Sequence, residues 1–103
     1  MNEDVYGYRR AYQRFMCFLK GTCESSGGKS QEISCNDISY KGAGVITAQP
    51  LAINSNLKMQ LSNPKIGPIE VEGKVCWCNN VYGKWRAGVS FNKILPFSLE
   101  KIV

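Results

Sequence analysis

Three arginines close together are the most distinctive chemical feature of the sequence. Arg9, Arg10 and Arg14 fall within six residues, and the chain has only one other arginine. A guanidinium presents a planar fork of donors that fits a phosphate or a guanine edge, and its flat face can stack on a base. The arginine cluster, with the motif Arg10-x-x-x-Arg14, therefore favours an anionic partner. A solvated, cationic arm is the alternative interpretation of the same residues.

A second motif, Asp37-x-Ser39-x-x-Gly42, adds the complementary chemistry. An ionised carboxylate only accepts hydrogen bonds, so Asp37 suits a partner with N–H donors. Ser39 offers a small donor and acceptor, and Gly42 permits a positive φ or a close approach of a base. Taken alone, a turn closed by the Asp37 or Ser39 side chain explains this motif equally well. Likewise, a β-bulge alone is a sufficient explanation for Gly42 and Gly44.

Composition and charge narrow the function classes. The chain has 103 residues, enough for one domain, and 44% of them are hydrophobic, as in ordinary globular proteins. Thirteen Lys and Arg against eight Asp and Glu give a net charge of +5, which favours anionic partners. There is no histidine, so the commonest general base and metal ligand are missing. We expect a binding protein that is not an enzyme and that needs no metal or other cofactor.

Alternating apolar residues and turn signals predict about six strands, which is typical of an all-β barrel or sandwich. Gly42 and Gly44 are expected to interrupt the sheet, and 79–83 to connect the hairpin of the last two strands. The tail predicts one or two helical turns with Ser98 as N-cap. The expected strands cover 14–23, 31–39, 45–47, 57–62, 69–80 and 84–91.

The tryptophans and cysteines are assigned structural roles. Strict alternation places Trp77 and Trp85 on the apolar faces of paired strands, so we expect them in the core rather than against a ligand. The same pattern places Cys76 and Cys78 together on the opposite face, where a redox role is conceivable but disfavoured. Five cysteines without a secretory signal indicate reduced, structural thiols rather than a disulfide framework.

The two motifs, in this order and beside β segments, resemble those of the bacterial PilZ family. The resemblance runs from Arg9 to Phe91 and includes the segments GAGVIT, GKVCWC and AGVSF, the last similar to the family's Gly-Val-x-Phe ending. It implies a six-stranded antiparallel barrel with a short C-terminal helix. It also implies a flexible arm over residues 1–13 that carries the arginine motif, and a barrel domain over 14–103.

The resemblance further implies a ligand, cyclic di-GMP, bound on the outer surface of the barrel. The residues expected to bind it are Arg9, Arg10, Arg14, Asp37, Ser39 and Gly42. The domain is then expected to relay this second-messenger signal to an unidentified effector protein. The alternative is a PilZ-fold interaction domain that does not depend on nucleotide.

Other partners and locations are disfavoured by the sequence. A basic barrel that binds single-stranded nucleic acid would expose aromatics along a groove, whereas most aromatics here fall on apolar faces. The longest apolar runs are only a few residues, and the first residues lack a basic stretch followed by an apolar one. We therefore expect a cytoplasmic protein that neither binds nucleic acid nor enters a membrane.

Overall fold

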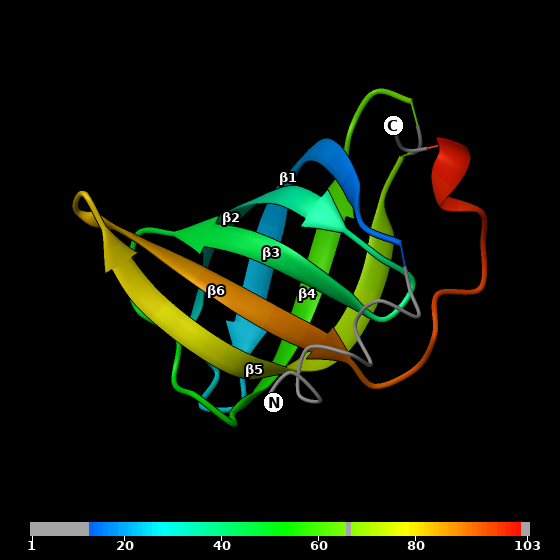
Figure 1. The fold of residues 1–103 in the computed structure, drawn as a ribbon. Coiled ribbons are helices and arrows are strands. Elements are labelled where there is room, and N and C mark those ends of the chain that lie inside the picture. The colour runs from blue at the N-terminus through cyan, green and yellow to red at the C-terminus, as the bar shows by residue number, and fades with distance from the viewer. Residues whose placement is uncertain (1–12, 66, 102–103) are drawn as a thin grey trace, which may run out of the picture.

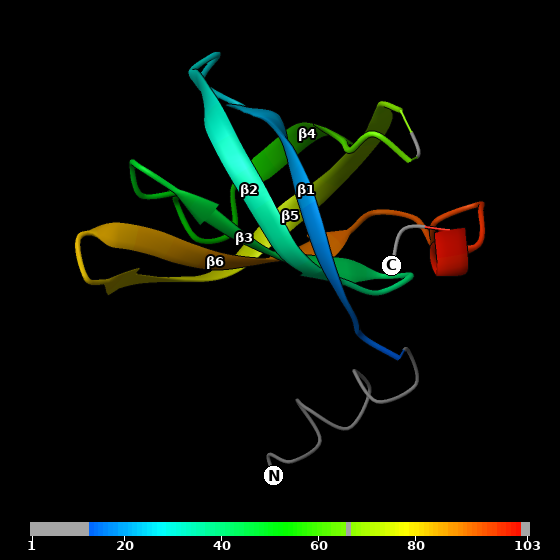
Figure 2. The same ribbon diagram turned by 90° about the horizontal axis from the view of Figure 1, so that it is seen from above.

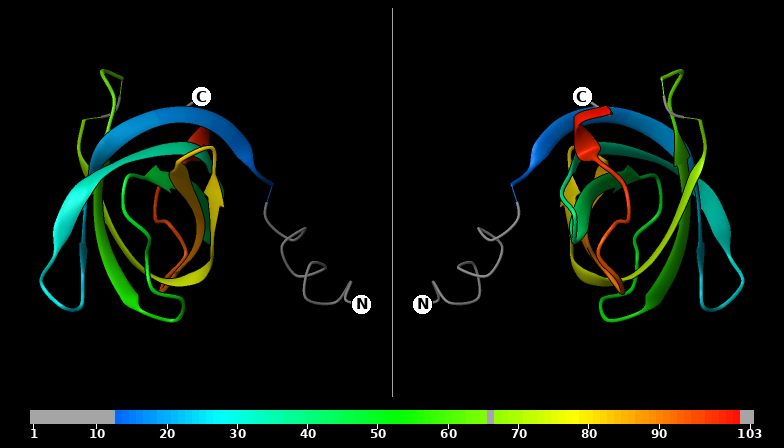
Figure 3. Two further views of the ribbon diagram at one scale, coloured as in Figure 1. Left: turned by 90° about the vertical axis from the view of Figure 1, so that its left-hand side faces the viewer. Right: turned by 90° about the vertical axis from the view of Figure 1, so that its right-hand side faces the viewer.

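The computed structural model describes residues 13–65 and 67–101 of the chain. Six antiparallel strands form a closed barrel in the order β1-β2-β3-β6-β5-β4, as Figures 1 and 3 show. The all-β, six-stranded barrel predicted from the sequence is thus confirmed. The strands are β1 (Phe15–Ser25), β2 (Ser30–Ile38), β3 (Gly42–Thr47), β4 (Asn56–Ser62), β5 (Ile69–Val81) and β6 (Lys84–Phe91).

Apolar side chains from all six strands fill the barrel interior. In most strands every second residue is buried and its neighbours are exposed, as in β4, where Leu57, Met59 and Leu61 alternate with polar residues. This burial is the main stabilising term, since each fully buried side chain of this size contributes about 1.5–3 kcal/mol. The other strands contribute Leu19, Cys23, Ile33, Cys35, Ile38, Ala43, Val45, Val71, Val75, Ala87, Val89 and Phe91.

A bulge breaks the alternation in β2. Cys35 lies opposite Val45 and Asp37 lies opposite Gly44, so Asn36 is an extra residue relative to β3. Without the bulge Asp37 would share the inward face of Cys35; with it, Ile38 takes the next core position and Asp37 turns outward. Within the described chain the Asn36 Oδ1 atom is buried without a hydrogen-bond partner, a cost that the bulge imposes locally.

A second bulge, in β5, has the same effect on a tryptophan. Val75 lies opposite Val89 and Trp77 opposite Gly88, so Cys76 is the extra residue. Trp77 is consequently 36% exposed on the outer face, while Cys78 packs against the core. The expectation that Trp77 lies in the core and that Cys76 and Cys78 share a face was therefore wrong, because it assumed unbroken alternation.

The β5–β6 hairpin projects beyond the rest of the barrel (Figure 1). Val81 pairs with Lys84, so its loop is the two residues Tyr82 and Gly83, both with positive φ, at 52° and 84°. Two positive φ values are typical of the type I′ turn that matches the twist of a hairpin. The connection is thus shorter and later than the predicted 79–83.

The C-terminal segment runs back to the end of the barrel away from this hairpin (Figures 1 and 2). The predicted helical turns are a single 3₁₀ turn, Leu99–Lys101, within the described chain. Ser98 caps it, because its Oγ accepts a hydrogen bond from the Glu100 amide at 3.3 Å. Leu95 and Leu99 are buried and extend the core. No helix within 13–65 and 67–101 is long and apolar enough to cross a membrane.

Two isoleucine substitutions test this division between core and surface. Ile33→Ala removes a side chain that is 4% exposed and should lower the free energy of unfolding by about 2–5 kcal/mol. Ile53→Ala alters a side chain that is 57% exposed and should change it by about 0.5 kcal/mol or less. Urea denaturation followed by circular dichroism measures both. Equal losses in the two variants would contradict the assigned core.

Candidate functional site

A row of outward-facing residues crosses four strands of the barrel wall. Asp37 on β2 lies opposite Gly44 on β3, Gly44 lies opposite Gly88 on β6, and Gly88 lies opposite Trp77 on β5. The two bulges turn the outer members of this row outward, and the two glycines lie between them. The row therefore places a carboxylate and an indole on one patch of surface.

The two glycines allow these side chains to lie against the backbone. A Cβ atom built on Gly44 would lie 2.7 Å from the Asp37 Oδ2 atom, and one on Gly88 would lie 2.2 Å from the Trp77 Nε1 atom. Both distances are too short for any real side chain. Glycine is thus needed at both positions for close approach, and any other residue would displace the carboxylate or the indole.

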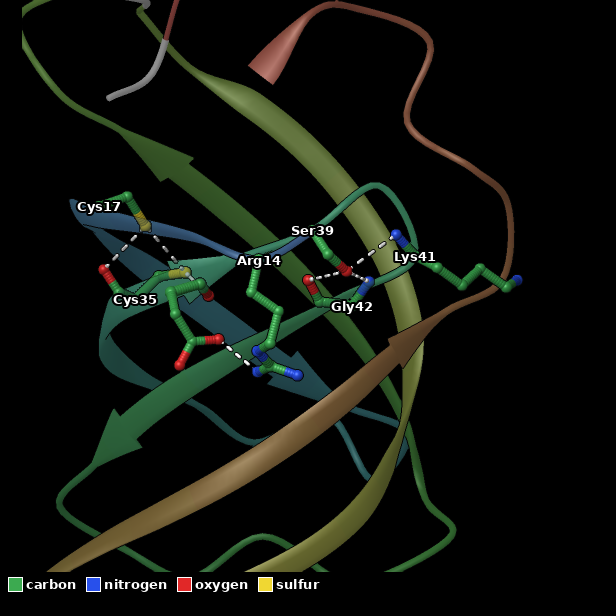
Figure 4. Close-up of polar contacts among 7 residues, drawn as sticks. Arg14, Cys17, Cys35, Ser39, Lys41 and Gly42 are labelled. Atoms are coloured by element: carbon green, nitrogen blue, oxygen red, sulfur yellow. Dashed lines mark hydrogen bonds and ion pairs between the residues drawn. The ribbon is translucent and has the colours of Figure 1, made fainter. Parts of the chain in front are cut away.

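Arg14, just before β1, joins the patch through an ion pair. Its Nη2 atom donates to the Asp37 Oδ1 atom (Figure 4). The Arg14 side chain is 46% exposed and that of Asp37 only 18%. Such a partly exposed pair stabilises the fold by about 0–1 kcal/mol at most, so its main effect is to fix the positions of the two groups. Asp37 is the one partner of Arg14 in the described chain, and a guanidinium has five N–H donors. Within that part of the chain, the other donors of the fork have no protein partner.

Ser39 and Gly42 shape the turn between β2 and β3. Ser39 is 7% exposed, and its Oγ atom accepts hydrogen bonds from the amides of Lys41 at 3.2 Å and Gly42 at 3.1 Å (Figure 4). A Cβ atom on Gly42 would lie 2.8 Å from the Val89 carbonyl oxygen, so glycine lets β3 approach β6. Gly42 begins β3 instead of interrupting the sheet. The structure thus brings Arg14 and Asp37 together and gives Ser39 and Gly42 supporting positions beside them.

The same turn is tied to the C-terminal segment. The Tyr40 carbonyl accepts a hydrogen bond from the Leu95 amide at 2.9 Å, and the Tyr40 hydroxyl accepts one from the Leu99 amide at 3.1 Å. The Lys41 Nζ atom donates to the Phe91 carbonyl at 2.5 Å, and the Lys41 carbonyl accepts from the Phe91 amide at 2.7 Å. A shift of the turn would therefore move the segment that follows β6.

Sequence reasoning assigned no site role to Trp77, Gly44 or Gly88, and it placed Trp77 in the core. The segments GAGVIT and AGVSF contain both glycines, but nothing in the sequence alone reveals the bulge that brings Trp77 beside them. Two predicted residues, Arg9 and Arg10, lie outside the described residues. So does the predicted arm of residues 1–13, except for its last residue.

The close contact between Gly88 and the indole can be tested by fluorescence. In a Trp85→Phe background Trp77 is the only tryptophan. Gly88→Ala should shift its emission to longer wavelength, because the new methyl group displaces the indole into water. Gly27→Ala is the matched control, since a Cβ atom there meets no atom within 4 Å. An emission maximum unchanged by Gly88→Ala would refute the contact.

The supporting position of Ser39 predicts a loss of stability. Ser39→Ala removes the acceptor of two backbone amides in a buried turn and should lower the free energy of unfolding by about 1–3 kcal/mol. Ser26→Ala, at an exposed position, should have almost no effect. Urea denaturation measures both variants. If Ser39→Ala is as stable as the unmodified protein, the hydroxyl does not hold the turn.

Comparisons with known proteins agree with this architecture. The family model described as "PilZ domain" matches residues 8–103. A search of curated proteins gave no match. Among solved structures, the PilZ domain of YcgR from Escherichia coli, determined with c-di-GMP, superposes with a TM-score of 0.68 at 16% identity. That match covers 85% of this chain and 81% of the other.

Two longer proteins contain a similar fold. The inhibitor of motility MotI (DgrA) from Bacillus subtilis superposes with a TM-score of 0.69 at 21% identity, over 85% of this chain and 44% of that one. PlzA from Borreliella burgdorferi, determined with c-di-GMP, has a TM-score of 0.64 at 19% identity, over 98% and 42%. This chain thus spans less than half of either protein. With a family model that matches nearly its whole length, the chain belongs to the PilZ domain family.

Proposed function

We propose that this domain binds cyclic di-GMP on the outer barrel wall, over the row that runs from Asp37 to Trp77. The observation that carries the proposal is the Arg14–Asp37 pair beside Gly44 and Gly88. It combines a phosphate-binding fork with an acceptor for guanine donors, next to an indole held against Gly88. The PilZ domain of YcgR and the protein PlzA, both similar in fold, were determined with c-di-GMP.

Each group of the row matches a part of this ligand. The open donors of Arg14 suit a phosphate or the O6/N7 edge of a guanine, and the Asp37 carboxylate suits the guanine N–H groups. The partly exposed indole of Trp77 offers a face on which a purine stacks. Arg9 and Arg10 are proposed to bind the remaining phosphate and base edges. Ser39 and Gly42 are proposed to act by holding the turn.

A different face of the barrel is less suitable for an anionic ligand. The hollow over β1, β4 and β5 is lined by Glu24, Glu70 and Glu72, with Lys58 among them. Three carboxylates against one ammonium group would repel two phosphates. The charge of this hollow therefore makes it a poorer site for the ligand than the Arg14 face.

The domain is further proposed to relay binding to an unidentified effector protein. The hydrogen bonds that tie Tyr40 to Leu95 and Leu99 offer a path from the site to the C-terminal segment. One observation favours the alternative of an interaction domain without nucleotide: the Asp37 carboxylate already has a partner in Arg14.

Titration calorimetry distinguishes the two. The receptor predicts saturable heat with cyclic di-GMP and none with cyclic di-AMP. Adenine lacks the O6 acceptor that would face Arg14 and the N1–H and N2–H donors that would face Asp37. Absence of heat with both ligands at high micromolar concentration would reject the receptor and favour the interaction domain.

Substitution of Arg14 gives a sharper test of the site. Arg14→Ala should weaken cyclic di-GMP binding by about ten-fold to a hundred-fold, since it removes charge-assisted hydrogen bonds. Lys58→Ala removes the same charge on β4, across the barrel, and should change affinity little. Calorimetry on both variants measures the difference. Equal losses would mean that net charge, not the fork at this position, binds the ligand.

A further inference from the structure

Two cysteine thiols lie side by side, close in sequence to Arg14 and Asp37. The Sγ atoms of Cys17 on β1 and Cys35 on β2 are 3.8 Å apart, and both cysteines are free (Figure 4). Cys17 is half-buried and Cys35 fully buried, at 0% exposure. They come from the two strands that carry Arg14 and Asp37. They are not the pair Cys76 and Cys78, for which the sequence made a redox role conceivable.

The backbone already holds the two sulfurs within reach of a bond. A disulfide needs an S–S distance of about 2.05 Å, so the sulfurs must approach by less than 2 Å in total. Both strands are irregular here, since pairing shifts register between Met16 and Leu19 in β1 and at Asn36 in β2. A bulged backbone adjusts more easily than a regular ladder, because fewer ladder hydrogen bonds fix it.

The two thiols differ in reactivity in a complementary way. A hydrogen bond from the Cys35 thiol lowers the pKa of Cys17 below its ordinary value, an effect larger than the opposing effects of burial and of the Asp37 charge. The same hydrogen bond, together with burial, raises the pKa of Cys35. The thiolate therefore forms on Cys17, the more accessible sulfur. Cys35 keeps its proton and lies in place to react second.

We propose that Cys17 and Cys35 form an oxidation site, at which a peroxide converts the thiol pair into a disulfide that weakens ligand binding at Arg14 and Asp37. The effect on the ligand rests on the function proposed above, whereas the oxidation does not. The arrangement fits a nucleophilic and a resolving cysteine.

The chemistry balances in two steps. The Cys17 thiolate attacks one peroxide oxygen, the O–O bond breaks, and the departing hydroxide takes a proton to become water, leaving a sulfenic acid on Cys17. The Cys35 sulfur then attacks the Cys17 sulfur, the S–O bond breaks, and the hydroxyl leaves with the Cys35 proton as a second water. Two thiols are oxidised by two electrons and one peroxide is reduced to two waters.

The disulfide would affect the site because each cysteine is only two or three residues away from a residue of the ion pair. Cys35 is two residues from Asp37, and its Sγ atom lies 3.3 Å from the Asp37 carbonyl oxygen. Cys17 is three residues from Arg14, so closing the S–S bond draws β1 and β2 together close to the ion pair. The Asp37 carboxylate, held against Gly44 at the bulge, then leaves its place in the row.

Peptide mapping of the full chain tests the oxidation. Trypsin places Cys17 on residues 15–20 and Cys35 on 30–41, apart from Cys23 on 21–29 and from Cys76 and Cys78 on 75–84. After hydrogen peroxide, mass spectrometry without reductant should find 15–20 joined to 30–41, lighter by two hydrogen atoms. Cys76→Ser, at an exposed thiol, should give the same product. Oxidation confined to the other cysteines, or disulfides among them, would overturn the site.

Calorimetry with cyclic di-GMP tests the coupling. Peroxide should weaken binding by about ten-fold, and dithiothreitol should restore it. Dithiothreitol does not reduce methionine sulfoxide, so the recovery excludes an effect of the exposed Met16. Cys17→Ser should bind equally with and without peroxide.

The outcomes separate the two proposals. The joined peptides with unchanged affinity would overturn the coupling and leave the receptor intact. A reduced protein that binds no cyclic di-GMP would overturn the receptor and the coupling with it, while the peptide map would still decide the oxidation site.

Discussion

The constraint on which the site depends is the period of two in a barrel strand. Every second residue of a closed barrel must face the core, so a functional side chain on the outer wall requires either the right parity or a bulge. In this chain two bulges, at Asn36 and Cys76, release Asp37 and Trp77 from the inward face and return Ile38 and Cys78 to it. The core thus stays filled. The outer wall gains a carboxylate and an indole at one level of the barrel.

The same irregularity links the site to the rest of the molecule. The bulge in β2 lies between the paired thiols of Cys17 and Cys35 and the β2–β3 turn, and the turn is hydrogen-bonded to the C-terminal segment through Tyr40. A site built on a regular ladder of hydrogen bonds would be held more rigidly. A change at that site would then move the turn and the C-terminal segment less. Among the described residues, the buried Asn36 Oδ1 atom has no hydrogen-bond partner, so this side chain adds nothing by that atom to the support of the bulge.

Most of the fold follows from local patterns, whereas half of the site does not. Alternating apolar residues predicted all six strands. The two motifs marked Arg14 and Asp37 as separate ligand-binding candidates, and the ion pair between them was not predicted. Trp77 was misplaced because a bulge leaves no signature in residue types alone. A serine at position 39 fits both a ligand contact and the closing of a turn. Only the burial of Ser39 and its two amide partners distinguish these roles.

The central claim is that the row from Asp37 to Trp77 forms the ligand site, and nitrogen–proton NMR spectra recorded during a cyclic di-GMP titration test it most directly. The Trp77 indole N–H and the amides of Gly44 and Gly88 report on the row, and the Lys58 amide reports on β4 across the barrel. The account predicts large, saturable shifts for the first three signals and little change for Lys58. Saturable shifts that centre on β4, with the Trp77 indole and both glycines unmoved, would contradict it.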